Sequence, residues 1–84
     1  MPYITAESKR KLEMFNTSNH TYQTPGELNY FLTKECIRYI SQKGSSYQTY
    51  NDVLGVLNAM SHEVYRRLIA PYEDQKCKEN GDVF

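Results

Sequence analysis

The feature that most constrains the fold is a helical pattern that runs from Thr49 to Gly81 and is interrupted once, by Pro71. Apolar residues recur along it at intervals of three and four residues, which is the spacing of one face of an α-helix. They form two neighbouring rows: Val53, Leu57, Met60, Val64 and Leu68, and beside them Tyr50, Leu54, Tyr65 and Ile69. Two rows predict a helix that is buried on more than one side. Roughly 20 helical residues span about 30 Å, so other elements are expected to pack along it.

The two ends of this helix and its proline predict its shape. Thr49 is expected to cap the start, with Asp52 in place of the usual Glu or Gln of a capping box. Pro71 removes a backbone hydrogen bond and clashes with the preceding turn, at a cost of about 3 kcal/mol. The helix therefore either kinks or ends near Ala70 and restarts with Pro71 at the first helical position. We favour a sharp bend there, with Gly81 as the end signal.

The stretch before this helix carries the clearest local signal in the chain. In Thr24-Pro25-Gly26-Glu27, Thr24 caps a helix, Pro25 takes its first position and Glu27 reaches back to the cap. A helix is predicted from Pro25 to Lys43, and Gly44 ends it. Its apolar stripe consists of Leu28, Phe31, Leu32, Cys36, Tyr39 and Ile40. The short turn that Gly44 opens predicts that this helix lies antiparallel to the next one.

The N-terminal third is expected to contain one short helix. Residues 1–4 read as extended chain, Thr5 caps the helix, and the polar run from Asn16 to Gln23 is predicted to be a loop. Val83 and Phe84 are expected to dock against Tyr3 and Ile4. The fold class is therefore all-α: a small domain of three or four helices, spanning residues 1–84, around a long C-terminal helix bent at Pro71.

The totals exclude several classes of protein. The 10 basic and 10 acidic residues cancel, which is not the charge of a dedicated duplex nucleic-acid binder. The chain has no apolar run long enough to span a bilayer and no signal-peptide core, so a cytoplasmic location is expected. With 84 residues and two cysteines the chain has a thin core and no disulfide framework, which makes self-association an effective way to bury apolar surface.

The candidate chemistry is sparse. His20, His62, Cys36 and Cys77 are not spaced for a metal site, and no cofactor is predicted. The run Ser61-His62-Glu63 cannot form a catalytic relay, since neighbours in a helix point about 100° apart. No catalytic residue is therefore predicted, and the protein is expected not to be an enzyme.

The strongest candidates for a functional role flank Pro71. They are Tyr65, Arg66 and Arg67 before it, and Tyr72, Glu73 and Asp74 after it. One interpretation is a salt-bridged joint, in which Arg66 pairs with Glu63 and Arg67 with Glu73 or Asp74. The other is a binding site, in which the guanidinium groups and tyrosine rings hold an anionic or aromatic ligand or a protein partner. The sequence leaves both open.

Four segments carry a family resemblance: MPYI at residues 1–4, PGELNY at 25–30, YxTxNxVxGVL at 47–57, and ExYRRxxAPYEDxKxxENGDV at 63–83. In these segments the chain resembles a family of short uncharacterised proteins of phages, prophages and some archaea. Residues 9–24 depart from that pattern. The resemblance implies a viral or mobile-element gene expressed in a microbial cytoplasm, and it carries over no activity. It also marks Asn29 and Tyr30 as candidate binding residues.

Two functions follow as hypotheses. The first is a non-enzymatic accessory protein that self-associates and binds a host or viral protein. The second is a protein that binds or sequesters a nucleotide signal in counter-defence. The candidate binding residues for either are Asn29, Tyr30, Tyr65, Arg66, Arg67 and Tyr72, and the structural residues are Thr24, Pro25, Glu27, Gly44, Pro71 and Gly81.

Overall fold

The chain folds into helices alone, in the part that the structure describes. The structure is a computed structural model and describes residues 2–15 and 21–84. Its elements are α1 (Ala6–Phe15), α2 (Pro25–Lys43), α3 (Tyr47–Val64), a π-helical turn η1 (Tyr65–Ile69) and α4 (Ala70–Asn80). The last three join into one helix of 34 residues. The predicted all-α class with a long C-terminal helix is confirmed.

The ends of α2 are where the local signals place them. The Thr24 hydroxyl accepts a hydrogen bond from the backbone N–H of Glu27 at 3.2 Å, and Pro25 opens the helix. Gly44 closes it at φ 92°, and its N–H donates to the carbonyl of Ile40 at 2.8 Å. A positive φ of this size is open to glycine and strained for other residues, so the turn into α3 depends on Gly44. The predicted bounds of this helix are confirmed.

The predicted start of the next helix is wrong by one turn. Ser46, not Thr49, is the N-cap of α3: its side chain accepts from the backbone N–H of Thr49 at 3.1 Å. Asp52 does not complete a capping box and instead accepts from the side-chain amide of Gln48 at 2.7 Å. Thr49 lies in the first turn of α3 and is a buried residue. Its hydroxyl oxygen is 3.1 Å from the hydroxyl oxygen of Ser46. Ser46 and Thr49 both carry a hydroxyl that can cap a helix. Because Ser46 is the cap, α3 begins about one turn earlier than predicted.

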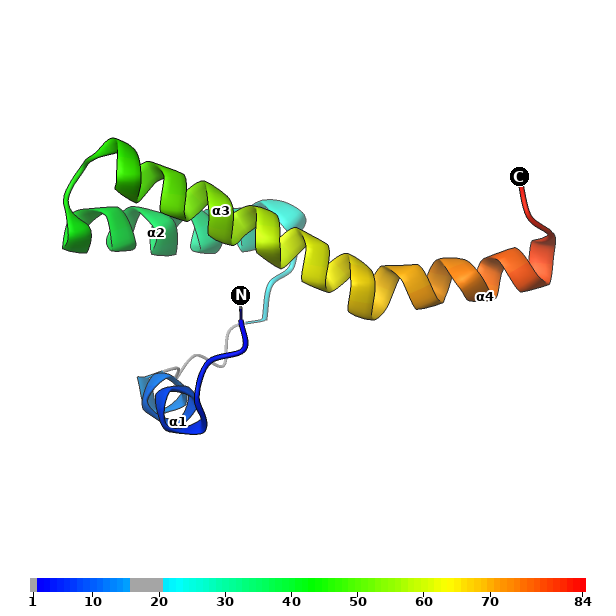
Figure 1. Cartoon of the computed structure of the whole chain (residues 1–84), viewed down its shortest axis with the longest axis horizontal. Coiled ribbons are helices and arrows are strands. Elements are labelled where there is room, and N and C mark those ends of the chain that lie inside the picture. The colour runs from blue at the N-terminus through cyan, green and yellow to red at the C-terminus, as the bar shows by residue number, and fades with distance from the viewer. Residues whose placement is uncertain (1, 16–20) are drawn as a thin grey trace.

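Pro71 is accommodated by widening the turn before it. The N–H of Ala70 bonds the carbonyl of Tyr65, five residues back, and Ile69 and Ala70 keep right-handed helical backbone angles. A π turn moves the carbonyls away from the proline ring, which relieves the clash without ending the helix. The helix axis changes direction at this point (Figure 1). The alternative in which the helix stops near Ala70 is therefore wrong, and the helix bends while remaining continuous.

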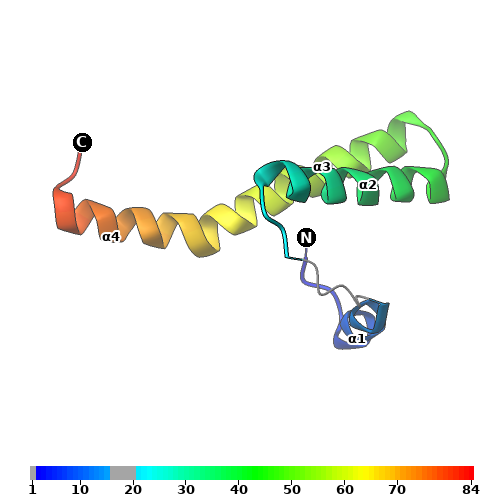
Figure 2. The ribbon, with the colours of Figure 1, turned by 180° about the vertical axis from the view of Figure 1, so that it is seen from behind.

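The elements form an elongated molecule. α2 and α3 lie side by side as an antiparallel pair, which we call the hairpin (Figures 1 and 2). The remainder of the long helix, η1 with α4, projects beyond the hairpin and is called the arm. The radius of gyration is 16.9 Å and the longest extent is 50 Å. A compact chain of 84 residues has a radius of gyration of about 12 Å, so much of this chain lies outside any compact body.

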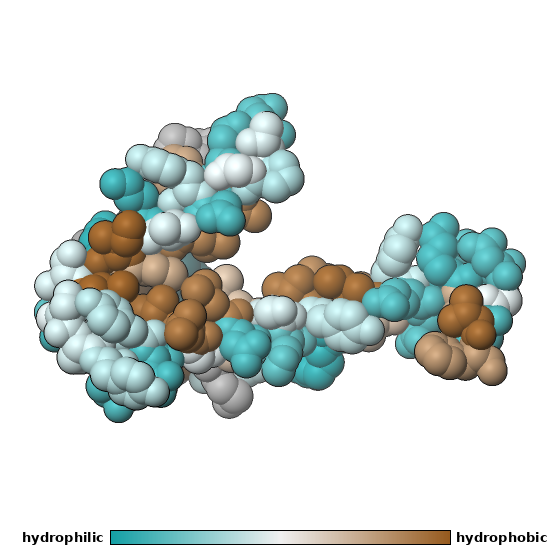
Figure 3. Space-filling view, turned by 90° about the horizontal axis from the view of Figure 1, so that it is seen from above, coloured by the Kyte–Doolittle hydropathy of each residue, from teal (hydrophilic) through white to brown (hydrophobic). Residues whose placement is uncertain are grey.

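The expectation of a helix buried on more than one side is wrong. Among the residues that the structure describes, no hydrophobic side chain is buried, and Thr49 alone reaches that class. In residues 2–15 and 21–84, α2 is the helix that packs along α3, and the arm has no helix beside it. Hydrophobic residues gather on the surface over the hairpin and continue onto the arm (Figure 3). The periodicity identified the apolar face correctly, but the described residues leave most of it exposed.

The two ends of the chain are not neighbours. Val83 is 90% exposed and Phe84 is fully exposed, so neither docks against Tyr3 and Ile4 as expected. Gly81 ends α4 at φ 90°, and the two residues extend from the tip of the arm (Figure 1). Thr5 caps α1 as predicted, accepting from the N–H of Ser8 at 3.1 Å. Of the predicted loop, residues 16–20 lie outside the described residues, and residues 21–23 are non-helical.

Candidate functional site

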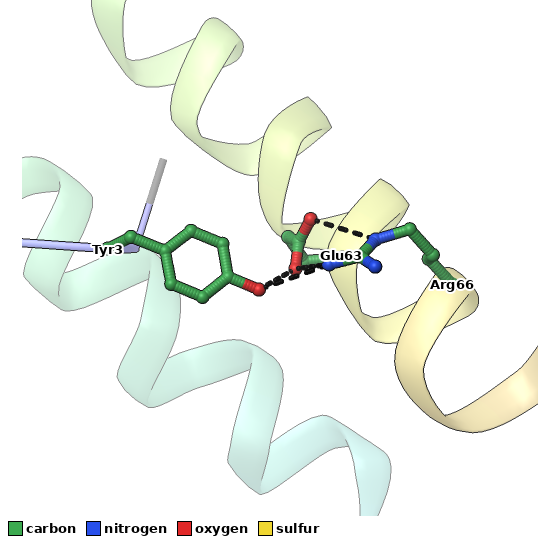
Figure 4. Close-up of polar contacts among 3 residues, drawn as sticks. All are labelled: Tyr3, Glu63 and Arg66. Atoms are coloured by element: carbon green, nitrogen blue, oxygen red, sulfur yellow. Dashed lines mark hydrogen bonds and ion pairs between the residues drawn. The ribbon is translucent and has the colours of Figure 1, made fainter.

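A polar cluster ties the extended N-terminus to the long helix. The Tyr3 hydroxyl donates a hydrogen bond to Oε2 of Glu63 (Figure 4). Arg66 binds the same carboxylate through two atoms, with Nε 3.3 Å from Oε1 and Nη2 3.1 Å from Oε2. Nη2 of Arg66 also donates to the Tyr3 hydroxyl at 3.2 Å. We call these three residues the latch; it joins the N-terminal segment to the long helix through residues that are 60 positions apart in sequence.

The latch shifts the titration of its members. The hydrogen bond from Tyr3, followed by that from Arg66, holds the pKa of Glu63 below its ordinary value. The Glu63 carboxylate raises the pKa of Arg66, mainly by hydrogen bonding. Each group thus stabilises the charged form of the other, so the latch is closed while Glu63 is ionised. The predicted pairing of Arg66 with Glu63 is confirmed.

Arg67 does not form the predicted bridge across the bend. Within the described residues, no ion pair joins it to Glu73 or Asp74. Glu73 lies instead beside Tyr65, where its hydrogen bond raises the pKa of the tyrosine hydroxyl. The π turn is the physical reason, because the wider turn rotates the residues after Pro71 relative to those before it. The prediction of a salt-bridged joint is therefore half correct. Arg66 pairs with Glu63, but among the described residues Arg67 pairs with neither Glu73 nor Asp74.

The other predicted binding residues are dispersed over the surface. Asn29 accepts from the Thr33 hydroxyl on the same helix at 3.0 Å. The ring of Tyr30 lies edge-on to Phe31 and under the ammonium group of Lys34. Tyr72 lies on the arm, 63% exposed, with Lys76 over its ring. In the described part of the chain, no hydrogen bond, ion pair or ring contact joins Asn29, Tyr30 or Tyr72 to the arginines.

The hairpin carries an apolar groove. A cavity of about 250 Å³ opens between its two helices, and a second one continues toward the start of α2. The first is lined by Leu32, Glu35, Cys36 and Tyr39 from α2 and by Val53, Val56, Leu57 and Met60 from α3. The sequence pattern placed most of these residues on apolar helix faces and predicted that they would be buried. The positions were predicted correctly, but most of these side chains are exposed. A lining with one carboxylate suits an apolar side chain better than a charged ligand.

The residue types that could bind a metal or form a catalytic relay are not joined into one group within the described residues. The described residues contain no group of three or more His, Cys, Asp and Glu side chains placed to hold a metal ion. Within Ser61-His62-Glu63 the carboxylate is engaged by Tyr3 and Arg66, so it does not orient His62. None of the helices in residues 2–15 and 21–84 is both long and apolar enough to cross a membrane.

The sequence had missed the role of Tyr3. No local pattern links it to Glu63, because contacts between distant parts of a chain leave no periodic signal. The one available indication was that the MPYI segment belongs to the same set of motifs as the arginine segment.

Comparison with known proteins gives one match. The family model described as Domain of unknown function (DUF6899) matches residues 1–83. No curated protein and no solved structure is significantly similar to the chain.

Proposed function

The chain belongs to the family of the Domain of unknown function (DUF6899), and we propose that it is a non-enzymatic, protein-binding subunit that associates with further copies of itself. One observation carries this proposal: no hydrophobic side chain of the described residues is buried. A helix with a wide apolar stripe is stable in water only if that stripe is covered. Since the described residues leave most of the stripe exposed, another chain is the natural cover.

The amount of exposed surface supports association. The chain exposes 7813 Å², whereas a compact monomer of 9.9 kDa exposes about 5200 Å². The difference is about 2600 Å² per chain by this scaling. A standard interface buries about 800 Å² per partner, and obligate ones bury more. The excess is therefore large enough for an obligate interface between copies.

A wider partner is part of the proposal. The resemblance to short phage and archaeal proteins supports an accessory role for a virus or mobile element, in which the assembled protein binds a host or viral protein in a microbial cytoplasm. The exposed apolar residues at the tip of the arm, Val83 and Phe84, are available for such a contact.

Unfolding at several protein concentrations tests self-association. If folded chains associate, dilution favours the unfolded state, and the melting temperature rises with chain concentration. We expect a steady increase between about 1 and 100 μM. A cooperative transition with the same midpoint across that range would contradict the proposal.

A second candidate function is binding of a nucleotide-like ligand. Its support is Arg67, whose side chain forms no ion pair among the described residues, together with the neighbouring exposed rings of Tyr65 and Tyr72. Melting with mono-, di- and cyclic nucleotides tests it. A ligand at 100 times its Kd stabilises the folded state by about 2.7 kcal/mol. Absence of any shift across the panel would reject this candidate.

A further inference from the structure

The long helix carries a row of residues with the spacing of a coiled-coil seam. Beginning at Tyr50, the steps are four, three, four, three and four residues, which keeps the row on one line along α3; the last step enters the π turn, where Leu68 lies. The row consists of Tyr50, Leu54, Leu57, Ser61, Val64 and Leu68, and we call it the seam. All of its members are exposed, and Leu54 and Leu68 are 64% and 67% exposed.

The chain's own contacts lie on other faces of this helix. α2 packs beside Val53, Val56 and Met60, which line the groove with it. The latch contacts Glu63 and Arg66, which fall at the outward positions of the same seven-residue repeat. Within the described residues, Leu57 alone is shared between the seam and the groove. The seam is therefore the apolar face of the long helix that neither α2 nor the N-terminus uses.

We propose that a second copy of this chain docks antiparallel along the seam, with a two-fold axis near Ala59. The inference rests on the self-association proposed above and adds the face and the orientation. The six positions are symmetric about that residue, which a two-fold interface requires. Antiparallel docking sets Leu54 opposite Val64 of the partner subunit, Tyr50 opposite Leu68 of the partner subunit, and Leu57 opposite Ser61 of the partner subunit.

The composition of α4 favours this orientation over a parallel one. A parallel dimer would set the two copies of α4 side by side, where Tyr72 is the only large hydrophobic residue that α4 exposes. In the antiparallel dimer residue 71 lies opposite residue 47, so each α4 runs past the start of α3 of the other copy and its polar surface stays in water.

The exposed surface of one chain is large enough for a dimer interface with a second copy. About 2600 Å² per chain is exposed beyond what a compact monomer of this mass exposes. A standard interface needs about 800 Å² per partner, which this excess covers along the seam without the arm. The groove between α2 and α3 opens beside the seam, through Leu57, so the docked helix would cover part of it as well.

Disulfide cross-linking tests the face and the orientation, in full-length chains with Cys36 and Cys77 replaced by Ala. We expect a mixture of the variants Leu54→Cys and Val64→Cys to form a cross-linked dimer under mild oxidation. We expect neither variant to cross-link with itself. Self-linkage of Leu54→Cys would overturn the antiparallel orientation. A protein that is dimeric by mass but forms no link in the mixture would overturn the seam while leaving self-association intact.

A charge substitution provides a second, independent readout. Leu54→Glu is expected to raise the dimer dissociation constant by more than about 100-fold, because a two-fold interface contains the change twice. Leu12→Glu is the matched control, since Leu12 is similarly exposed, at 61%, and lies on α1 away from the seam. Helicity by circular dichroism shows whether the monomer stays folded. Equal dissociation constants for both variants would reject the seam, whereas a monomeric wild-type protein would reject the proposed function itself.

Discussion

Replacement of Gly55 by Ala measures what surrounds the middle of α3. Gly55 lies in the interior of this helix, and a Cβ added there meets no atom within 4 Å. Glycine in a helix interior costs about 0.5 to 1 kcal/mol relative to alanine, because it loses more backbone entropy on folding. With open space around it, the methyl group adds no clash. We therefore expect Gly55→Ala to stabilise the protein by about 0.5 to 1 kcal/mol.

Thermal unfolding at a fixed chain concentration is the assay. For a domain of this size, 1 kcal/mol corresponds to a shift of about 4 to 8 °C in melting temperature. Gly44→Ala is the matched control with the opposite sign: the space is also open, but φ is 92°, and a left-handed conformation costs alanine about 1 to 2 kcal/mol. A loss of stability in Gly55→Ala would refute the reasoning, since it would mean that a second helix or a ligand approaches Gly55 closely. Gly55 is not a seam residue, so the proposed dimer leaves this prediction unchanged.

Three further predictions concern the cap and the latch. Thr24→Ala should cost about 1 kcal/mol in a urea titration, because the N–H of Glu27 loses its acceptor; an unchanged midpoint would show that the cap contributes nothing. The pKa of Glu63 is lowered below 4.5 in the folded protein, so the latch stabilises the fold fully above that value and is lost as pH falls through the folded pKa. The protection of the amides at residues 3–5, measured against the intrinsic exchange rate at each pH, should therefore fall in acid, and protection that persists after Glu63 is protonated would contradict this. Tyr3→Phe should return the pKa of Glu63 part of the way toward its ordinary value in a carboxyl NMR titration, since Tyr3 is the largest cause of the shift; an unmoved pKa would assign the shift to Arg66 alone.

The sequence predicted the helices well where their ends are set by local chemistry. Thr24, Pro25 and Gly44 act on residues within four positions of themselves, so the bounds of α2 could be inferred from the sequence. The start of α3 was missed because Ser46 and Thr49 both offer a hydroxyl at a suitable position, and the choice between them depends on the turn that precedes the helix. The bend at Pro71 was predicted, but the π turn that accommodates the proline was not.

The sequence could not predict what covers each face. Spacing shows that Leu54 and Leu68 lie on an apolar stripe, but burial depends on a neighbour, and this chain supplies none there. The latch was missed for a related reason. Tyr3 and Glu63 are 60 residues apart, and their meeting depends on how the extended N-terminus crosses the long helix. Candidate binding residues chosen by type alone therefore fell in separate places on the surface.

The mass of the protein in solution tests the central claim most directly. Sedimentation or light scattering of the full chain at about 100 μM should give a dimer or a larger assembly of 9.9 kDa chains, because a chain whose described residues bury no hydrophobic side chain needs a second copy to complete its core. A single species of 9.9 kDa at that concentration, folded by circular dichroism, would contradict the account.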